Sequence, residues 1–418
     1  MPNYAKKTTM PTSGLQEGMA EATRLTNAGK LSEATAAIQR ALGGDTPGSP
    51  LAGRMATPTQ SDFRVTEDRP GSGNMSPGTK VKPDADTMVS RLMNLPDSLT
   101  RDVLRKGNSP EKEQRARAPQ PEAPATAGRF VSGSYSNRAG TRGYKLYIPS
   151  GVKGQALPLL VMLHGCTQSP DDFAAGTRMN TLAESGDFFV VYPEQAGSAN
   201  MNKCWNWFNA GDQQRDQGEP SIIAGITHQI AATQPIDTKR IYVAGMSAGA
   251  AMAVILGETY PDLYAAVGVH SGLAYGAAHD LPSAFGAMQG GGQDVSRPKT
   301  RAQRAADLTR TVPMIVFHGD RDSTVNQRNA EQILNQRLSD LDATPPKASV
   351  RQGQVRGGRS YTHSVYRDSG GEPVAERWIV HGAGHAWSGG GPRGSYTDAN
   401  GPDASMEMVR FFMEHPRR

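Results

Sequence analysis

The sequence contains little cysteine, no long hydrophobic run and no block of basic residues, and each absence excludes a class of protein. Two cysteines among 418 residues are too few for a disulfide-rich scaffold. No stretch reaches the ~18–20 apolar residues of a membrane-spanning helix, so we expect no membrane span. The net charge of +5 comes without clustered Lys and Arg. We therefore expect no nucleic-acid partner, because phosphate binding needs concentrated positive charge.

The amino-terminal residues lack the apolar segment of a secretory signal. They read MPNYAKKTTMPTSGLQEGMA, with a basic start but no apolar core. We therefore expect either a cytoplasmic protein or one exported by a non-classical route.

Composition divides the chain near residue 128. Residues 14–42 carry apolar side chains at helical spacing, so we predict a short helical segment within residues 1–42. Residues 43–128 are rich in Pro, Gly, Ser and Thr and have too few apolar residues to offset the entropy of ordering. This composition predicts a disordered linker with one short helix over 84–104. We assign residues 129–418 to one folded catalytic domain.

From residue 129 onwards, strands and helices are predicted to alternate. An antiparallel hairpin over 130–149 comes first, and short apolar runs typical of strands buried on both faces follow it. The predicted strands are 157–163, 188–192, 241–244, 266–269, 314–317 and 377–380, and the predicted helices are 221–232, 248–258 and 327–338. Strands separated by helices indicate an α/β fold, with a mostly parallel sheet and helices on both faces. In such sheets the chemistry gathers where the strands end at their carboxyl edge.

The stretch Gly245-Met246-Ser247-Ala248-Gly249 lies between a predicted strand and an alanine-rich helix. It fits the G-x-S-x-G nucleophile elbow, in which a serine occupies a strained strand-to-helix turn and the glycines let strand and helix approach each other. The alternative is an ordinary glycine-rich turn, where a serine would gain little stability. Ser247 is therefore the candidate nucleophile.

Two further strand ends supply the partners that a serine nucleophile needs. A serine hydroxyl is a poor nucleophile until a histidine accepts its proton, and a carboxylate must hold that histidine in the right tautomer. Asp320 and Asp322 both follow strand 314–317, and we favour Asp322 because it lies further out on the loop. His381 and His385 follow strand 377–380, and we favour His385 because it lies beyond a Gly-Ala-Gly turn. The resulting order Ser, Asp, His is that of α/β-hydrolases.

Such a site also needs backbone N–H groups that stabilise the developing oxyanion. We assign one to Ala248, directly after the nucleophile, and the other to Cys166, in the loop after strand 157–163. His164 and His318 stand in His-Gly dipeptides at strand ends. We interpret both as structural histidines that bond the loop backbone.

From residue 129 to 418 the sequence resembles the polyhydroxybutyrate (PHB) depolymerase and feruloyl esterase family of α/β-hydrolases. The motifs that carry the resemblance are LPLLVMLHGCTQSPDDFA, VVYPEQ, CWNWF, IYVAGMSAGAAM, HGDRDSTV, GAGHAWSGG and YTDANGPDASMEMVRFF. The resemblance implies an α/β-hydrolase fold and hydrolysis of carboxylic esters through an acyl-enzyme, with no metal and no organic cofactor. It places Ser247, Asp322 and His385 in the catalytic triad.

The resemblance leaves the ester open. Poly- or oligo(3-hydroxyalkanoates) are the first expectation for the substrate, and feruloyl or acetyl esters on polysaccharide are the alternative. A peptidase or thioesterase on the same fold is a further enzyme alternative, because a fold does not fix the bond that is cleaved. A different class of function is binding to a polymer granule or a partner protein through residues 1–128.

Two pairs of residues complete the expected site. Cys166 and Cys204 belong to motifs shared with a largely secreted family and follow neighbouring strands at one sheet edge, so we expect a disulfide. The alternative is two buried free thiols, as is usual in a reducing cytosol. Trp205 and Trp387 lie beside the predicted catalytic loops, and we expect one of them to line the acyl or alcohol site, with core packing as the alternative.

Overall fold

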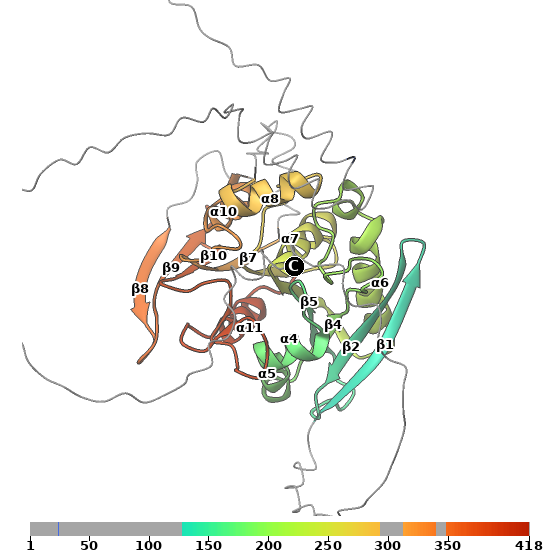
Figure 1. Cartoon of the computed structure of the whole chain (residues 1–418). Coiled ribbons are helices and arrows are strands. Elements are labelled where there is room, and N and C mark those ends of the chain that lie inside the picture. Colours follow the sequence, from blue (N-terminus) through green and yellow to red (C-terminus); the bar gives the residue numbers. More distant parts are fainter. Residues whose placement is uncertain (1–23, 25–127, 293–311, 340–347, 418) are drawn as a thin grey trace, which may run out of the picture. The chain divides into compact units, whose positions relative to one another are not determined.

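The computed structural model describes residues 128–292, 312–339 and 348–417, together with Arg24 alone. Within these residues one sheet has the strand order β1-β2-β4-β3-β5-β6-β7-β10-β9-β8. The strands are β1 (Arg129–Asn137), β2 (Gly140–Ile148), β3 (Leu157–Leu163), β4 (Phe189–Pro193), β5 (Ile236–Met246), β6 (Ala266–His270), β7 (Met314–Gly319), β8 (Ser349–Gln354), β9 (Ser360–Arg367) and β10 (Pro373–Val380). The hairpin β1–β2 forms one edge and β8–β9 the other (Figure 1).

The six central strands, β4, β3, β5, β6, β7 and β10, pair in parallel, and the strands outside them pair antiparallel. Because the central strands run in one direction, their carboxyl ends meet at a single edge of the sheet. Every candidate site residue follows one of these ends, so the topology gathers them.

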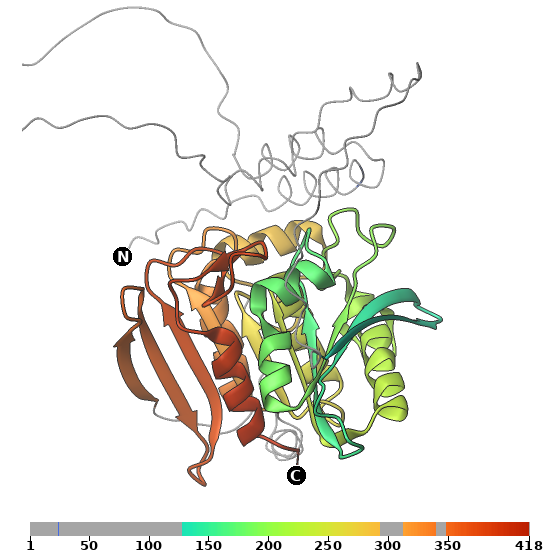
Figure 2. The same ribbon diagram turned by 90° about the horizontal axis from the view of Figure 1, so that it is seen from below.

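Helices cover both faces of the sheet (Figures 1 and 2). One face packs against α6 (Gly218–Thr233), α7 (Ala248–Thr259) and α10 (Arg328–Ser339). The other packs against α4 (Pro170–Thr177), α5 (Met179–Gly186) and α11 (Ala404–Glu414). The remaining described elements are η1 (Ala210–Gln213), α8 (Leu281–Gly290), β11 (Trp387–Ser388) and β12 (Thr397–Asp398).

Alternate residues of the central strands point into two separate hydrophobic cores. On β3, Leu159 and Val161 belong to the core with α6, α7 and α10, whereas Leu160 and Met162 belong to the core with α4, α5 and α11. All four are at most 2% exposed. This two-sided burial explains why the central strands read as continuous apolar runs.

The predicted α/β architecture is confirmed, with the predicted hairpin, strands and helices in place. The antiparallel strands β8 and β9 were not predicted, because most of their residues are exposed or only half-buried and the sequence SVRQGQ lacks an apolar face. Apart from Arg24 and Gly128, the predicted helical segment in 1–42, the linker 43–128 and the helix 84–104 lie outside the described residues.

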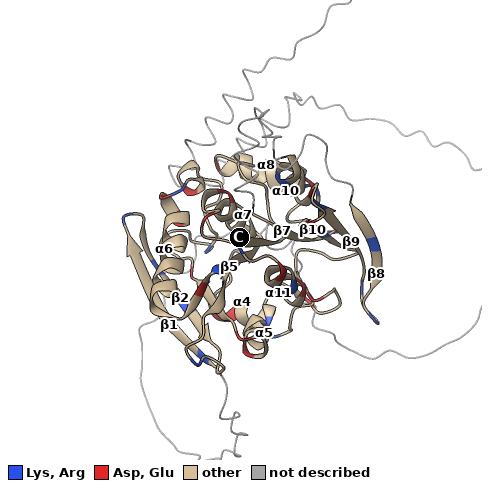
Figure 3. Ribbon diagram, turned by 180° about the vertical axis from the view of Figure 1, so that it is seen from behind, with Lys and Arg blue, Asp and Glu red and all other residues tan. Residues whose placement is uncertain are grey.

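Charge and helix length bear on possible partners. In Figure 3, basic and acidic residues are scattered among uncharged ones along the ribbon of the described elements. In the described part of the chain, no helix combines the length and apolarity needed to cross a membrane.

Candidate active site

Ser247 stands at the sharp turn between β5 and α7. Its backbone has φ 57° and ψ −121°, a conformation that L-residues rarely adopt. The Ser247 N–H donates to the carbonyl of His270 on β6, at 2.9 Å, which holds the turn against the neighbouring strand. A strained serine at the mouth of a helix matches the predicted elbow, and such strain is concentrated at functional sites.

The two elbow glycines are required because backbones meet there. A Cβ on Gly249 would lie 2.1 Å from the carbonyl oxygen of Leu163. A Cβ on Gly245 would lie 2.4 Å from the backbone of Gly249. A side chain at Gly245 would therefore push α7 away from β5, and one at Gly249 would push α7 away from β3.

Asp322 and His385 are hydrogen-bonded to each other. Asp322 Oδ2 lies 2.8 Å from His385 Nδ1, and the Asp322 side chain is completely buried. Its other oxygen, Oδ1, accepts the N–H groups of Thr324 and Val325 at 3.0 and 2.8 Å. Burial raises the pKa of Asp322, but the charge and hydrogen bond of His385 outweigh it and lower the pKa to about 2. The carboxylate is therefore ionised at neutral pH and fixes the orientation of the imidazole.

The two rival candidates pair with each other instead. Asp320 Oδ2 lies 2.9 Å from His381 Nδ1, and Asp320 Oδ1 accepts the N–H of Gly382 at 2.6 Å. His381 Nε2 in turn lies 2.9 Å from Thr362 Oγ1. Asp320 thus ties the loop after β7 to the loop after β10. Among the described residues, no hydrogen bond joins Ser247 to His385.

The loop after β3 lies directly beside the nucleophile. A Cβ on Gly165 would be 3.5 Å from Ser247 Cβ, so the Cys166 amide that follows is close to the elbow. Ala248 opens α7, and its N–H is one of the helix N–H groups that have no intrahelical acceptor. In the described part of the chain, no acceptor is found for the Cys166 N–H. Of the two amides proposed from the sequence, one thus directly follows Ser247 and the other belongs to the loop that adjoins it.

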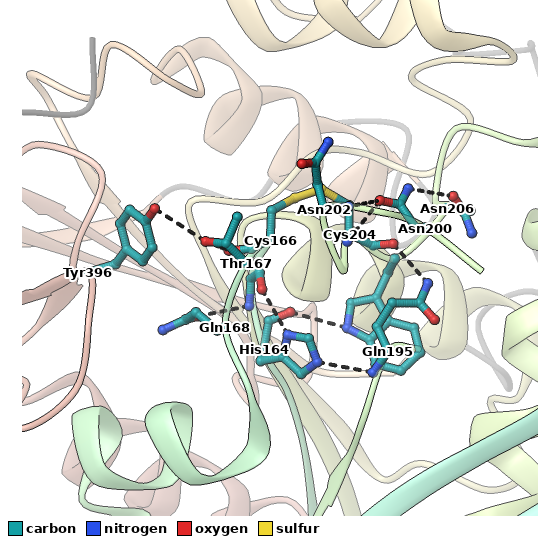
Figure 4. Close-up of a disulfide and its surroundings, with 12 residues drawn as sticks. His164, Cys166, Thr167, Gln168, Gln195, Asn200, Asn202, Cys204, Asn206 and Tyr396 are labelled. Atoms are coloured by element: carbon teal, nitrogen blue, oxygen red, sulfur yellow. Dashed lines mark hydrogen bonds between the residues drawn. A yellow bond between two sulfur atoms is a disulfide. The ribbon is translucent and has the colours of Figure 1, made fainter. Parts of the chain in front are cut away.

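Cys166 and Cys204 form the expected disulfide, with their Cα atoms 4.2 Å apart (Figure 4). A second tie runs beside it, because the Thr167 N–H donates to the Asn202 carbonyl at 2.7 Å. Asn200 Oδ1 accepts the Cys204 N–H at 3.3 Å. The loop that carries the proposed Cys166 donor is thus joined covalently to the loop that precedes Trp205.

A buried network of polar side chains holds the loop after β3 in place. His164 Nδ1 donates to the Gly165 carbonyl at 2.8 Å and Nε2 accepts the Gln195 N–H at 3.1 Å. Burial lowers the pKa of His164 to about 4, so the neutral ring keeps this tautomer. The Gln195 side chain donates to the Cys204 carbonyl at 2.8 Å and to Glu219, which is paired with Arg142 at 3.2 Å. Gln195 ends the motif VVYPEQ, and the sequence alone gives no sign of its role in this network.

The two structural histidines bond the backbone as expected. His164 does so in the loop after β3, and His318 Nε2 lies 2.8 Å from the Val325 carbonyl. His318 Nε2 is also 3.6 Å from Asp322 Oδ2, so the imidazole packs against the acid that orients His385.

The expectation that Trp205 or Trp387 lines the substrate site needs correction. Both indoles are fully buried, at 0% and 1% exposure. Trp205 Nε1 donates to the His164 carbonyl at 3.1 Å, and Trp387 Nε1 donates to Ser405 Oγ at 3.0 Å. Both residues are adjacent in sequence to the loops of the candidate site. Their side chains, however, are packed in the two hydrophobic cores, Trp205 in one and Trp387 in the other.

One residue of this edge was missed by the sequence reasoning. His270 ends β6 between the elbow strand β5 and the Asp322 strand β7. The signal was available in the stretch VGVHSGL, a strand end followed by Ser-Gly, which has the same form as the other strand ends at the site. For metals, the described residues contain no group of three or more His, Cys, Asp or Glu side chains placed to hold an ion.

Removing the disulfide should weaken the fold and slow the reaction. A bridge across 38 residues stabilises by about 3–4 kcal/mol, which corresponds to roughly 10 °C in melting temperature. The test compares melting curves and kcat of the oxidised protein, the reduced protein and a Cys166→Ala/Cys204→Ala variant. The backbone N–H of residue 166 survives in all three, so a fall in kcat would report its position. Equal kcat and melting temperature in all three would show that the bridge has neither role.

Comparison with known proteins places these features in one family. The sequence model of the family described as Esterase PHB depolymerase matches residues 142–357, just over half of the chain. The matched segment includes Ser247 and Asp322, and His385 follows it. A poly(3-hydroxyalkanoate) depolymerase C of Paucimonas lemoignei is 34% identical over 244 residues, which cover 57% of this chain and 57% of that protein.

Two further proteins show how widely the likeness extends. A feruloyl esterase B of Thermothelomyces thermophilus is 29% identical over 203 residues, which cover 46% of this chain and 67% of that enzyme. The solved structure of an acetyl xylan esterase from Aspergillus awamori superposes with a TM-score of 0.51 at 18% identity, covering 68% of this chain and 99% of that one. The structural likeness shows the α/β-hydrolase fold. With the family model, the depolymerase relative and the elbow geometry in agreement, the chain belongs to the PHB depolymerase family of esterases.

Proposed function

We propose that the protein is a serine esterase that hydrolyses carboxylic esters through an acyl-enzyme, with Ser247 as nucleophile, His385 as general base and Asp322 as the orienting acid. The observation that carries the proposal is the buried 2.8 Å contact between Asp322 and His385, at the same sheet edge as the strained Ser247. This arrangement supports acyl transfer because each group has the role that the chemistry requires.

In the first half of the reaction, Ser247 Oγ attacks the ester carbonyl carbon while His385 Nε2 takes the hydroxyl proton. Asp322 stabilises the imidazolium through Nδ1–H and remains ionised. The carbonyl oxygen becomes an oxyanion, to which the Cys166 and Ala248 N–H groups donate. His385 then gives its proton to the leaving alkoxide, and the alcohol departs from a Ser247-linked acyl ester.

In the second half, water replaces the alcohol. His385 removes a proton from the water, the hydroxide attacks the acyl carbonyl, and the same two amides stabilise the second oxyanion. Collapse returns the proton from His385 to Ser247 Oγ and releases the carboxylic acid. No other reactant is needed, because one water supplies all the atoms added.

For the substrate we propose poly- or oligo(3-hydroxyalkanoate) esters. The support is the 34% identity to a protein named as a poly(3-hydroxyalkanoate) depolymerase, compared with 29% for the feruloyl esterase relative. Feruloyl or acetyl esters on polysaccharide form the second candidate, because relatives with those names also match.

A panel of esters tests the proposal. It contains p-nitrophenyl esters of graded acyl length, 3-hydroxybutyrate oligomers, methyl ferulate and acetylated xylan, each measured as kcat/KM with the Ser247→Ala variant as blank. We expect the highest kcat/KM on the 3-hydroxybutyrate oligomers. A preference for methyl ferulate or acetylated xylan would transfer the assignment to the second candidate, and turnover of no ester would contradict the esterase proposal.

Residues 1–128 should be dispensable for hydrolysis of soluble esters. A chain that begins at Arg129, the first residue of β1, retains the whole sheet, so we expect kcat within about twofold of the full chain. The measurement pairs kcat on a p-nitrophenyl ester with binding of each chain to polymer granules. Loss of granule binding alone would assign binding to residues 1–128. An insoluble or inactive shortened chain would contradict the domain boundary.

A further inference from the structure

His270 contacts both halves of the proposed catalytic machinery. It is the last residue of β6, and its register partners are Met246 on β5 and Phe317 on β7. Its backbone carbonyl accepts the N–H of Ser247 at 2.9 Å. The backbone of His270 therefore holds the nucleophile elbow.

The His270 side chain contacts the loop that carries His385. Its Nε2 accepts the backbone N–H of Ser388, three residues after His385, at 3.0 Å. The ring is stacked on Trp387 with a centroid distance of 5.0 Å and on Phe317 at 5.9 Å. At 1% exposure the imidazole has no freedom to reach solvent. The loop that carries His385 is thus fastened to β6 through this ring.

The protonation of His270 follows from these contacts. A backbone N–H can only donate, so Nε2 must be the unprotonated nitrogen and Nδ1 must carry the proton. Nδ1 lies 3.3 Å from Ser271 Oγ, which can accept it. Burial lowers the pKa of His270 to about 3, with smaller contributions from His318 and His385 that lower it further, and Asp322 opposes them. The ring is therefore neutral throughout the pH range in which an esterase works.

We propose that His270 is a positioning residue that sets the distance between Ser247 and His385, through its carbonyl on one side and its Nε2 on the other. The inference rests on the proposed function and extends it to a residue that touches no substrate. No hydrogen bond joins Ser247 to His385 within the described residues, so their approach depends on what holds each of them. A displacement of about 1 Å in such a pair lowers the rate by about 10²-fold.

Two substitutions separate the acceptor from the ring. His270→Phe keeps an aromatic ring for stacking but removes the acceptor, whereas His270→Gln places an amide oxygen near the position of Nε2 and removes the ring. We expect His270→Phe to lower kcat on a p-nitrophenyl ester by about 10²-fold with KM within about twofold. His270→Gln should recover kcat to within about tenfold of wild type.

A matched control comes from a second stacked histidine. His363 on β9 is stacked on Trp378 at 4.1 Å and is 2.9 Å from Glu376, both within β10 and not in the loop that carries His385. His363→Phe should change the melting temperature without lowering kcat. Wild-type kcat in His270→Phe, or equal losses in His270→Phe and His270→Gln, would overturn the proposal.

The wild-type protein offers a test that needs no folded variant. In ¹H–¹⁵N spectra of the histidine side chains, His270 should be the neutral Nδ1–H tautomer and should not titrate between about pH 5 and 9. An Nε2–H tautomer, or a ring that gains a proton near pH 6, would overturn the Ser388 contact and the proposal with it. Because this readout does not involve ester turnover, a protein that hydrolyses no ester but shows the expected tautomer would refute the proposed function and not the contact.

Discussion

Replacing Ser247 by alanine should lower ester hydrolysis by on the order of 10⁴-fold or more and leave the fold intact. The reaction loses its nucleophile, so only the oxyanion donors and substrate binding can contribute to the residual rate. Structurally little is lost, because within the described residues the Ser247 hydroxyl makes no hydrogen bond. The measurement is kcat/KM on a p-nitrophenyl ester beside a melting curve. A purified variant that kept a tenth of wild-type activity would contradict the assignment.

A companion variant uses the strain at the same position. The φ of 57° with ψ of −121° at Ser247 is unfavourable for any side chain and accessible to glycine. Ser247→Gly should therefore be as inactive as Ser247→Ala but should melt at a higher temperature than Ser247→Ala. If Ser247→Gly melted at a lower temperature than Ser247→Ala, the turn would not be strained.

Replacing Asp322 by asparagine should lower kcat by about 10⁴-fold, because an amide no longer enforces the His385 tautomer that accepts the serine proton. Asp320→Asn is the matched control on the same loop. Its partners are His381 and Gly382, so we expect a loss of stability with kcat within about tenfold. Paired kinetics and melting curves decide the matter, and the reverse pattern would identify Asp320 as the acid.

The lowered pKa of Asp322 predicts that the free energy of unfolding depends on pH. The pKa of Asp322 lies below its ordinary value of 3.8 and near 2 in the folded protein, so its ionised form stabilises the fold above about pH 4. That contribution is lost as the pH falls towards 2. The difference in unfolding free energy between wild type and Asp322→Asn should therefore shrink as the pH falls from about 4 to 2. A difference that is the same at all pH values would exclude the linkage.

The central sheet was predictable because its strands are buried on both faces. A short, continuous apolar run such as LPLLVML is typical of a strand buried on both faces, and β3 spans the predicted residues 157–163. The edge strands β8 and β9 were not predictable in this way. Most of their exposed residues are polar, with Val350 as an exception. They are strands because β9 pairs with the edge of β10 and β8 pairs in turn with β9.

The site was predictable where the chemistry limits the choice and not where packing decides. Ser247, Asp322 and His385 were selected by residue type and chain order, and the structure brings Asp322 and His385 into contact. The direction of Trp205 and Trp387 was not available from position alone, since a residue beside a catalytic loop can point into either core. The role of His270 depends on two backbone N–H groups distant in sequence, which only the folded chain brings together.

The contact of Gly249 with the end of β3 has a consequence for how this sequence can change. A Cβ on residue 249 would lie 2.1 Å from the Leu163 carbonyl oxygen, so only glycine lets α7 pack this closely against the end of β3. The Ala248 amide precedes this glycine and the proposed Cys166 amide follows this strand end, so the same contact bears on the distance between the two amides. A substitution there would push the helix outwards and separate the two donors in one movement. A substitution at residue 249 should therefore lower the stability of the fold and the rate of hydrolysis together. A mutational library screened for heat resistance and one screened for hydrolysis should each retain glycine at 249. No substitution of this residue should raise stability at the expense of activity, or activity at the expense of stability.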